Sequence, residues 1–285
     1  MSKVLKELLG LLKLELLDDN LFLGQSQDLG FKAVFGGQVI GQALSAAKQT
    51  LSDERQLHSF HSYFLRPGDA TKPITYLVEV TRDGRSFSTR RVQAMQHGKT
   101  IFNLMASFQL DEQGFEHQDQ MPDVPGPEGL MSMFDLQLQH KDKIPLAMHD
   151  TIFAERPIEF RPVKEYDWLH PQKSEARNQV WMRAKGTMPD DLGINKYVLG
   201  YASDYNFLPT AVHPHGKSVW SRDFQIATID HAMWFHRPFS FNDWLLYDID
   251  SPSASSGRGL VRGKIFNRAG ELVASTAQEG VIRQY

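Results

Sequence analysis

Three polar residues in the second half of the chain have types and surroundings that could support chemistry. Asp204 lies in the largely apolar segment of residues 200–207, Thr228 lies in a segment typical of a β-strand, and Gln278 ends a strand of small residues. A buried carboxylate must be paired or hydrogen-bonded, because removing its charge from water is costly. Each residue also has a structural explanation, as a cap, a strand former or an edge amide. The elements that position the three residues must therefore be considered.

Other kinds of catalytic site are excluded by what the sequence lacks. It has no cysteine, which rules out a thiolate nucleophile, a thiolate zinc site and a Cys-ligated iron–sulfur cluster. It has no Gly-x-Ser-x-Gly, Gly-x-Gly-x-x-Gly, Walker-type or His-Glu-x-x-His motif. Of the 11 histidines, His58 and His61 are expected on opposite faces of a strand, and His213 and His215 have no evident third ligand. We therefore predict no metal site.

Composition narrows the class of protein further. The 285 residues carry 31 Lys and Arg against 34 Asp and Glu, a net charge of −3 that argues against a nucleic-acid-binding protein. No segment approaches the ~20 uncharged apolar residues of a membrane span. Residues 4–17 are rich in leucine, but charged residues interrupt them and no cleavage site follows, so they predict an amphipathic helix and not a signal peptide. We expect a soluble, intracellular protein.

The sequence contains one pattern of segments twice. Residues 62–67, Ser-Tyr-Phe-Leu-Arg-Pro, return 171 positions later as residues 233–238, Met-Trp-Phe-His-Arg-Pro. In both places a strand-like run, a serine-rich segment with arginine, and a small-residue strand follow in the same order. A period this long indicates two copies of one domain and not a solenoid.

Each copy is expected to be an α+β unit, in which one helix precedes and packs on an antiparallel sheet. The first helix is predicted over residues 35–51. The second starts at about Asp191 and carries Asp204. Thr228 follows on a strand whose alternation predicts that it shares a face with Asp230.

The two copies define the predicted domains. Residues 1–120 form the first, with the amphipathic helix at its start, and residues 151–285 form the second, which carries the candidate site. Three prolines within residues 122–127 mark the linker, residues 121–150. A short helix is expected in this linker at about residues 130–138.

The copies differ at the positions of the candidate site. Residues 31–49, the helix region of the first copy, contain no Asp or Glu, and Leu57 aligns with Thr228. The second copy thus has a carboxylate and a hydroxyl where the first copy is apolar. This divergence is typical of a duplication in which one half is functional and the other supports it. We predict one site per chain.

At these residues the chain resembles the type II acyl-CoA thioesterases of the double hotdog class, in which an antiparallel sheet wraps a long helix in each half. The resemblance covers the whole chain and is carried by residues 35–38, 58–69 and 230–238. The family's catalytic trio is an aspartate, a threonine and a glutamine. The resemblance implies that these roles fall on Asp204, Thr228 and Gln278.

The resemblance also implies a mechanism, the hydrolysis of an acyl-CoA thioester by a water molecule that the trio holds, with no cofactor. The substrate is expected to lie between the two halves. Backbone N–H groups of Gly36 and Gly37 are candidates to bind the thioester oxygen, and paired glycines equally serve close helix–sheet packing. Arginines are expected to bind the phosphates of coenzyme A. The candidates are Arg66, Arg85, Arg90, Arg237 and Arg258.

Two other functions stay open. Residues 204–209 faintly resemble the Asp-x-Asn-Pro-x-His motif of double hotdog enoyl-CoA hydratases, but the proline is displaced and no histidine follows within the motif. The other alternative is a non-catalytic acyl-CoA-binding module. Because hotdog sheets have exposed edges that pair or are covered, we expect a homodimer or homotetramer. Residues 282–285 lack a Ser-Lys-Leu peroxisomal signal, which favours a bacterial cytoplasm.

Overall fold

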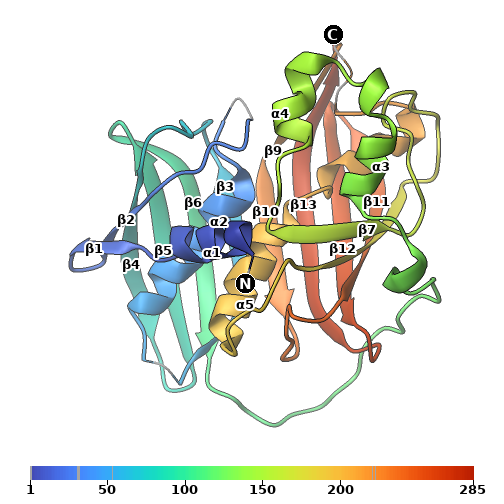
Figure 1. Ribbon diagram of the computed structural model, residues 1–285. Helices are drawn as coiled ribbons and strands as arrows, with labels where there is room; N and C mark the ends of the chain where they lie inside the picture. The colour runs from blue at the N-terminus through green and yellow to red at the C-terminus, as the bar shows by residue number, and fades with distance from the viewer. Residues whose placement is uncertain (1, 31–32, 53, 220, 222) are drawn as a thin grey trace.

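Two halves of similar design lie side by side in the computed structural model (Figure 1). The structure describes residues 2–30, 33–52, 54–219, 221 and 223–285. In each half an antiparallel sheet curves around one long helix, as the α+β tandem hotdog prediction requires. The fold prediction is therefore confirmed.

The elements of the first half follow the predicted order of a helix before the long strands. They are α1 (Lys3–Leu11), β1 (Glu15–Asp18), β2 (Leu21–Gly24), α2 (Gly36–Gln49), β3 (Gln56–Phe64), β4 (Ile74–Asp83), β5 (Phe87–Gln96) and β6 (Lys99–Gln109). The elements of the second half repeat this order. They are β7 (Ile158–Pro162), β8 (Arg177–Ala184), α5 (Leu192–Ser203), the 3-10 helix η4 (Leu208–His215), β9 (Phe224–Thr228), β10 (Asp230–Phe235), β11 (Leu245–Ser255), β12 (Arg258–Asn267) and β13 (Leu272–Gln284).

A single sheet runs through both halves, in the order β1-β2-β4-β5-β6-β3-β10-β13-β12-β11-β8-β7, with β9 also paired to β13. The halves meet where β3 pairs antiparallel with β10, and we call this pairing the seam. In its register Tyr63 lies opposite Asp230, and Ser59 lies opposite Trp234. The start of β10 therefore lies at the same end of the seam as the end of β3.

The two long helices pack against each other inside the sheet (Figure 1). Small residues allow the close approach, since a Cβ atom on Gly200 would lie 3.1 Å from Leu44, and one on Gly41 would lie 3.3 Å from the carbonyl oxygen of Tyr197. The contacts run antiparallel, which brings the end of α5 to the start of α2. No helix in the described part of the chain is long and apolar enough to cross a bilayer.

The sequence located both helices well but misjudged the last turn of the second. α2 matches the helix predicted over residues 35–51, and Asp191 caps α5 by accepting a hydrogen bond from the N–H of Ile194 at 2.9 Å. Helix α5 ends at Ser203, so Asp204 is its C-terminal cap and not an internal residue. The left-handed backbone of Asn206, with a φ of 56°, turns the chain away from the helix axis.

The strand that carries Thr228 contains a bulge that the alternation pattern did not predict. Thr228 lies opposite Gly280 of β13, whereas Ala232 lies opposite Ala277, so one extra residue is inserted between them. The insertion falls at Ile229, whose N–H donates to the carbonyl of Glu279 at 2.9 Å. Thr228 therefore faces the interior together with His231, and the prediction that it shares a face with Asp230 is wrong.

The segment between β6 and β7 packs along the second half. It contains α3 (Met133–Gln139), close to the helix expected at residues 130–138, followed by α4 (His149–Ile152). It also contains the short 3-10 helices η1 (Pro127–Gly129), η2 (Lys141–Lys143) and η3 (Leu146–Met148). Gln118 in this segment exchanges hydrogen bonds with Gly270 and Leu272 at the β12–β13 turn. The limits of the linker at residues 121 and 150 stay a prediction.

Candidate active site

Asp204, Thr228 and Gln278 lie next to one another in the structure. The side-chain amide of Gln278 donates to the hydroxyl oxygen of Thr228 at 2.8 Å, and the hydroxyl of Thr228 donates to the carboxylate of Asp204. Gln278 lies on β13 and is 1% exposed, and Thr228 is the last residue of β9. Three separate elements thus bring together the three residues that the sequence selected.

Asp204 is a largely buried carboxylate whose ionised form is partly stabilised. Burial raises its pKa from 3.8 to about 6, while hydrogen bonds from the backbone N–H of Gly37 and from Thr228 lower it. Gly37 lies in the first turn of α2, where the partial positive charge of the helix favours an anion. A carboxylate with a pKa near 6 is ionised at neutral pH and is more basic than an exposed aspartate, which suits a general base.

The two glycines at the start of α2 are required by close contacts. A Cβ atom on Gly36 would lie 2.7 Å from Oδ2 of Asp204, and one on Gly37 would overlap the carbonyl oxygen of Tyr201. The glycine pair therefore allows close packing, chiefly against the end of α5. The N–H of Gly37 donates to Asp204, and a role for either glycine at the thioester oxygen stays a prediction.

Aromatic side chains enclose the carboxylate. The ring of Phe35 lies 5.2 Å from that of Tyr201 and 4.3 Å from that of Tyr205, and the hydroxyls of the two tyrosines are 3.1 Å apart. Phe64, at the end of β3, lies 3.0 Å from where a Cβ atom on Gly36 would be. These rings keep much of the surrounding solvent away from Asp204, which is why desolvation is the largest influence on its pKa.

Two further polar residues continue the hydrogen-bonded chain behind the trio. Nδ1 of His231 lies 2.7 Å from Oε1 of Gln278, and Nε2 of His231 lies 3.0 Å from the hydroxyl oxygen of Ser203. Sequence reasoning missed both residues. The available signal was spacing: His231, Met233 and Phe235 are two residues apart on one strand, so they share the face that packs in the core.

The arginines proposed for the coenzyme A phosphates have different positions. Arg66 is exposed at the end of the seam near Thr228, and Arg237 lies at the opposite end. Each donates to a carbonyl of the next strand, Arg66 to Thr100 at 2.6 Å and Arg237 to Leu272 at 3.1 Å. Arg90 is 2% exposed and is paired with Asp83. Arg90 therefore has a structural role in the first half.

The histidines considered as metal ligands have ordinary partners. Nε2 of His58 lies 2.8 Å from the hydroxyl of Ser107, and the ring of His213 stacks on Tyr166 with centroids 4.2 Å apart. Among the residues that the structure describes, no three His, Asp or Glu side chains are placed to hold a metal ion.

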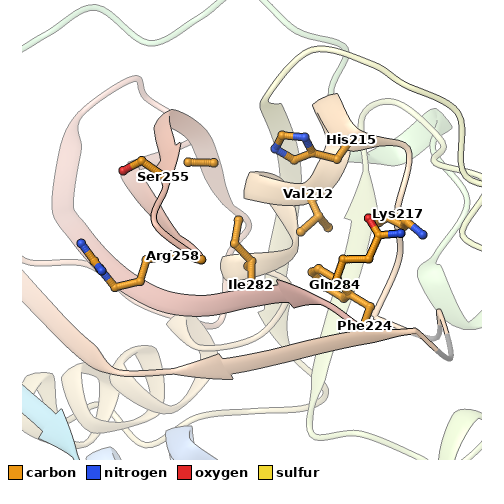
Figure 2. Close-up of a pocket in the computed structure, with 10 residues that line it drawn as sticks. Val212, His215, Lys217, Phe224, Ser255, Arg258, Ile282 and Gln284 are labelled. Atoms are coloured by element: carbon orange, nitrogen blue, oxygen red, sulfur yellow. The ribbon is translucent and has the colours of Figure 1, made fainter.

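Two surface hollows lie outside this cluster. One, of about 250 Å³, is lined by Val212, Phe224 and Ile282 with the charged groups of Lys217 and Arg258 at its rim (Figure 2). It lies at the far end of β9 from Thr228. The other, of about 540 Å³, lies between the first half and the connecting segment, and its lining includes Leu29 and Arg156.

Two hotdog halves joined in one chain define the double hotdog class. A family model described as acyl-CoA thioesterase matches residues 147–281, and one described as the acyl-CoA thioesterase N-terminal domain matches residues 25–109. Acyl-CoA thioesterase 2 of Haemophilus influenzae is 46% identical over 283 residues, covering 99% of both chains. Human acyl-coenzyme A thioesterase 8 is 42% identical over 95% of this chain and 87% of its own length.

Solved structures agree with these matches. An acyl-CoA thioesterase II from Mycobacterium marinum has a TM-score of 0.80 and 41% identity, with 98% of each chain covered. A hot dog fold protein from Alicyclobacillus acidocaldarius has a TM-score of 0.79 at 19% identity, which shows likeness of fold alone. The chain belongs to the acyl-CoA thioesterase family.

Proposed function

We propose that this acyl-CoA thioesterase releases a free fatty acid and coenzyme A by direct attack of a water molecule that Asp204, Thr228 and Gln278 hold. The observation that carries the proposal is the single hydrogen-bonded chain that ends at a buried carboxylate with a pKa of about 6. The chain has no cysteine nucleophile, so attack by water agrees with its composition. Family membership supports the reaction class, and the residue roles are the proposal.

The chemistry follows from the free hydrogen-bonding capacity of the trio. Gln278 uses one amide hydrogen on Thr228, and its second is available to a water oxygen. The carboxylate of Asp204 accepts the water's proton while the oxygen attacks the thioester carbon. The carbon–sulfur bond then breaks, and the proton held by Asp204 neutralises the departing thiolate. A positioned base of this kind contributes about 10²–10⁴-fold to the rate.

The acyl-CoA is proposed to lie between the halves. The contact of Gly37 in the first half with Asp204 in the second supports this. The 540 Å³ hollow between the first half and the connecting segment is within the usual size of a small-ligand pocket, about 300–1,000 Å³. Arg156 lines this hollow and influences the pKa of Tyr205, the residue after Asp204. Arg66, at the Thr228 end of the seam, is the better placed of the two main phosphate candidates, while Arg237 would serve only a ligand that reaches the other end.

Assembly and location complete the proposal. β1 and β7 are the outer strands of the sheet, and unpaired edges of this kind favour association of copies. We propose a homodimer or homotetramer in a bacterial cytoplasm. Light scattering coupled to size exclusion tests the assembly, and a single 32.5 kDa species at micromolar concentration contradicts it.

Thiol release from a series of acyl-CoA chain lengths tests the reaction. Hydrolysis is expected for the wild-type chain, and Asp204→Asn should lower kcat by about 10²-fold or more with little change in KM. Loss of enoyl absorbance from an enoyl-CoA, without thiol release, indicates a hydratase instead. Saturable binding without either reaction indicates a binding module. A folded Asp204→Asn variant with full activity excludes the proposed water-holding mechanism.

A further inference from the structure

The side chains behind the trio close a ring of hydrogen bonds. Starting at Asp204, the ring passes through Thr228, Gln278 and His231 to Ser203, which precedes Asp204 in the chain. The distances between polar atoms from Thr228 to Ser203 are 2.8, 2.7 and 3.0 Å. Asp204 and Ser203, which are neighbours at the end of α5, are therefore the first and last members of this ring.

The bulge at Ile229 makes this ring possible. In a regular strand, residues 228 and 231 would point to opposite faces of the sheet. The register change between Thr228 and Ala232 turns Thr228 to the face that His231 occupies, so Gln278 on β13 reaches both side chains. Bulges re-aim side chains next to active sites, and this one joins His231 to the trio.

The donors and acceptors of the ring have one direction that suits an ionised Asp204. Thr228 must donate to the carboxylate, so its oxygen accepts from the amide nitrogen of Gln278. The amide oxygen of Gln278 then faces His231, whose Nδ1 must carry the proton. In a neutral imidazole Nε2 then accepts, which requires the hydroxyl of Ser203 to point its one hydrogen at Nε2, at 3.0 Å, and not at the carbonyl oxygen of Gly200, at 2.9 Å.

The opposite amide orientation would disable the site. If Gln278 turned its oxygen toward Thr228, the hydroxyl hydrogen of Thr228 would go to that oxygen and leave the carboxylate of Asp204 without it. The second N–H of Gln278 would also point away from the water. The two orientations of an amide differ little in shape. The contact on the far side of Gln278 selects between them when Nδ1 of His231 carries the proton, which holds when Ser203 donates to Nε2.

We propose that His231 is a positioning residue, which fixes the orientation of the Gln278 amide and thereby the direction of every hydrogen bond from Gln278 to Asp204. The inference rests on the proposed function, because it assumes that Gln278 and Asp204 hold the attacking water. His231 itself is too far along the ring to touch the substrate, and it acts through Gln278.

The surroundings of His231 keep its ring neutral. The ring stacks on Phe60 with centroids 5.8 Å apart, and Phe207 lies 5.7 Å away on another side. Burial lowers the pKa of His231 to about 4, so it has one N–H over the working pH range. The titratable groups that interact with Asp204 are Tyr205 and Tyr247, whose pKa values are raised by burial, so they stay uncharged there.

Three substitutions at position 231 separate this role from a packing role. His231→Leu removes both ring nitrogens and keeps an apolar side chain between the two phenylalanines. His231→Asn keeps a donor where Nδ1 lies, and His231→Gln keeps one where Nε2 lies. Tyr76→Phe is a matched stability control, since it deletes a buried hydroxyl bonded to Gln42 at 2.7 Å in the first half.

For His231→Leu we expect kcat to fall by about 10- to 10²-fold, the cost of a misplaced catalytic group, with KM within about threefold. His231→Asn should recover most of the lost kcat, and His231→Gln should not. The acid limb of the pH–kcat profile should move to higher pH in His231→Leu, because Asp204 loses the hydrogen bond of Thr228. Tyr76→Phe should lower the melting temperature without changing kcat.

Two results would overturn the inference. One is an unchanged kcat in folded His231→Leu. The other is a loss of kcat in all three variants that follows the loss of melting temperature, with no rescue by asparagine and no shift of the pH profile. Gln278→Ala in the same assay separates the two proposals. Full activity of Gln278→Ala contradicts the proposed function, whereas an inactive Gln278→Ala beside a fully active His231→Leu contradicts only the role of His231.

Discussion

The backbone N–H of Gly37 in the first half donates a hydrogen bond to the carboxylate of Asp204 in the second half. Asp204 lies at the C-terminal end of α5, where the partial negative charge of its own helix disfavours an anion. The start of α2 offsets that effect with an N–H group and partial positive charge. The site thus depends on both halves, although all three candidate catalytic side chains come from the second.

Gly36→Ala should impair catalysis because its Cβ atom would lie 2.7 Å from Oδ2 of Asp204. We expect kcat to fall by about 10-fold or more, since small displacements of a catalytic group are costly. Gly10→Ala is the control, because a Cβ atom there meets nothing within 4 Å and the residue lies inside α1. That variant should be fully active and slightly more stable. Equal activity of the two variants would contradict the prediction.

The pH dependence of kcat should show Asp204 acting as a base. Its pKa of about 6 is above the usual 3.8, so the carboxylate is ionised above pH 6 and protonated below it. Activity should therefore rise as pH increases through 6 and decline about tenfold per unit below it. Thr228→Val should move this midpoint upward, because the hydroxyl that lowers the pKa is gone. Steady-state rates with an acyl-pantetheine, which lacks the nucleotide phosphates, isolate the enzyme's own titration.

Asp204→Asn should stabilise the fold at neutral pH while it removes activity. A raised pKa in the folded state means that the folded chain binds the proton more tightly than the unfolded chain. The stability due to this group is thus fully present below pH 3.8 and is lost as pH rises to about 6. The loss amounts to at most about 3 kcal/mol. Thermal melts should show a higher Tm for Asp204→Asn at pH 7.5, with the gain absent at pH 4.

Substitutions within the trio should not be additive. Thr228→Ala and Gln278→Ala should each lower kcat, because each removes a group that holds the water. In the Asp204→Asn background, each of these two substitutions should lower kcat by much less than it does alone, because a site without its base gains little from an ordered water. A double-mutant cycle in kcat measures this coupling. Independent, additive losses would mean that the three residues do not act on one molecule.

Much of this structure could be predicted from the sequence, because repeats and helix signals are local. The recurrence of residues 62–67 at 233–238 gave the tandem fold, and the acidic start at Asp191 gave α5. The comparison of the two copies singled out Asp204 and Thr228, whose side chains are hydrogen-bonded in the structure. Gln278 was also a candidate from its place at the end of a small-residue strand, and the family resemblance gave it a catalytic role.

The part of the site that could not be predicted depends on the bulge at Ile229, which has no local signal in the sequence. Strand alternation counts residues in twos, so the single residue inserted at Ile229 reverses the predicted face of Thr228. The same insertion brings His231 to Gln278. A lone histidine on an apolar strand face is most often a satisfied core residue, so no pattern in the sequence connected it to the site.

The seam has an evolutionary consequence. Because β3 and β10 belong to one polypeptide, each half meets the partner attached to it, at a concentration set by the connecting segment and not by the cell. In a symmetric dimer, any substitution at the contact would appear on both sides at once. Here a mutation at Gly36 alters one side alone. Because the halves are tethered, they can differ at their contact. The first half supplies the helix start that binds the carboxylate, and the second half supplies the carboxylate itself.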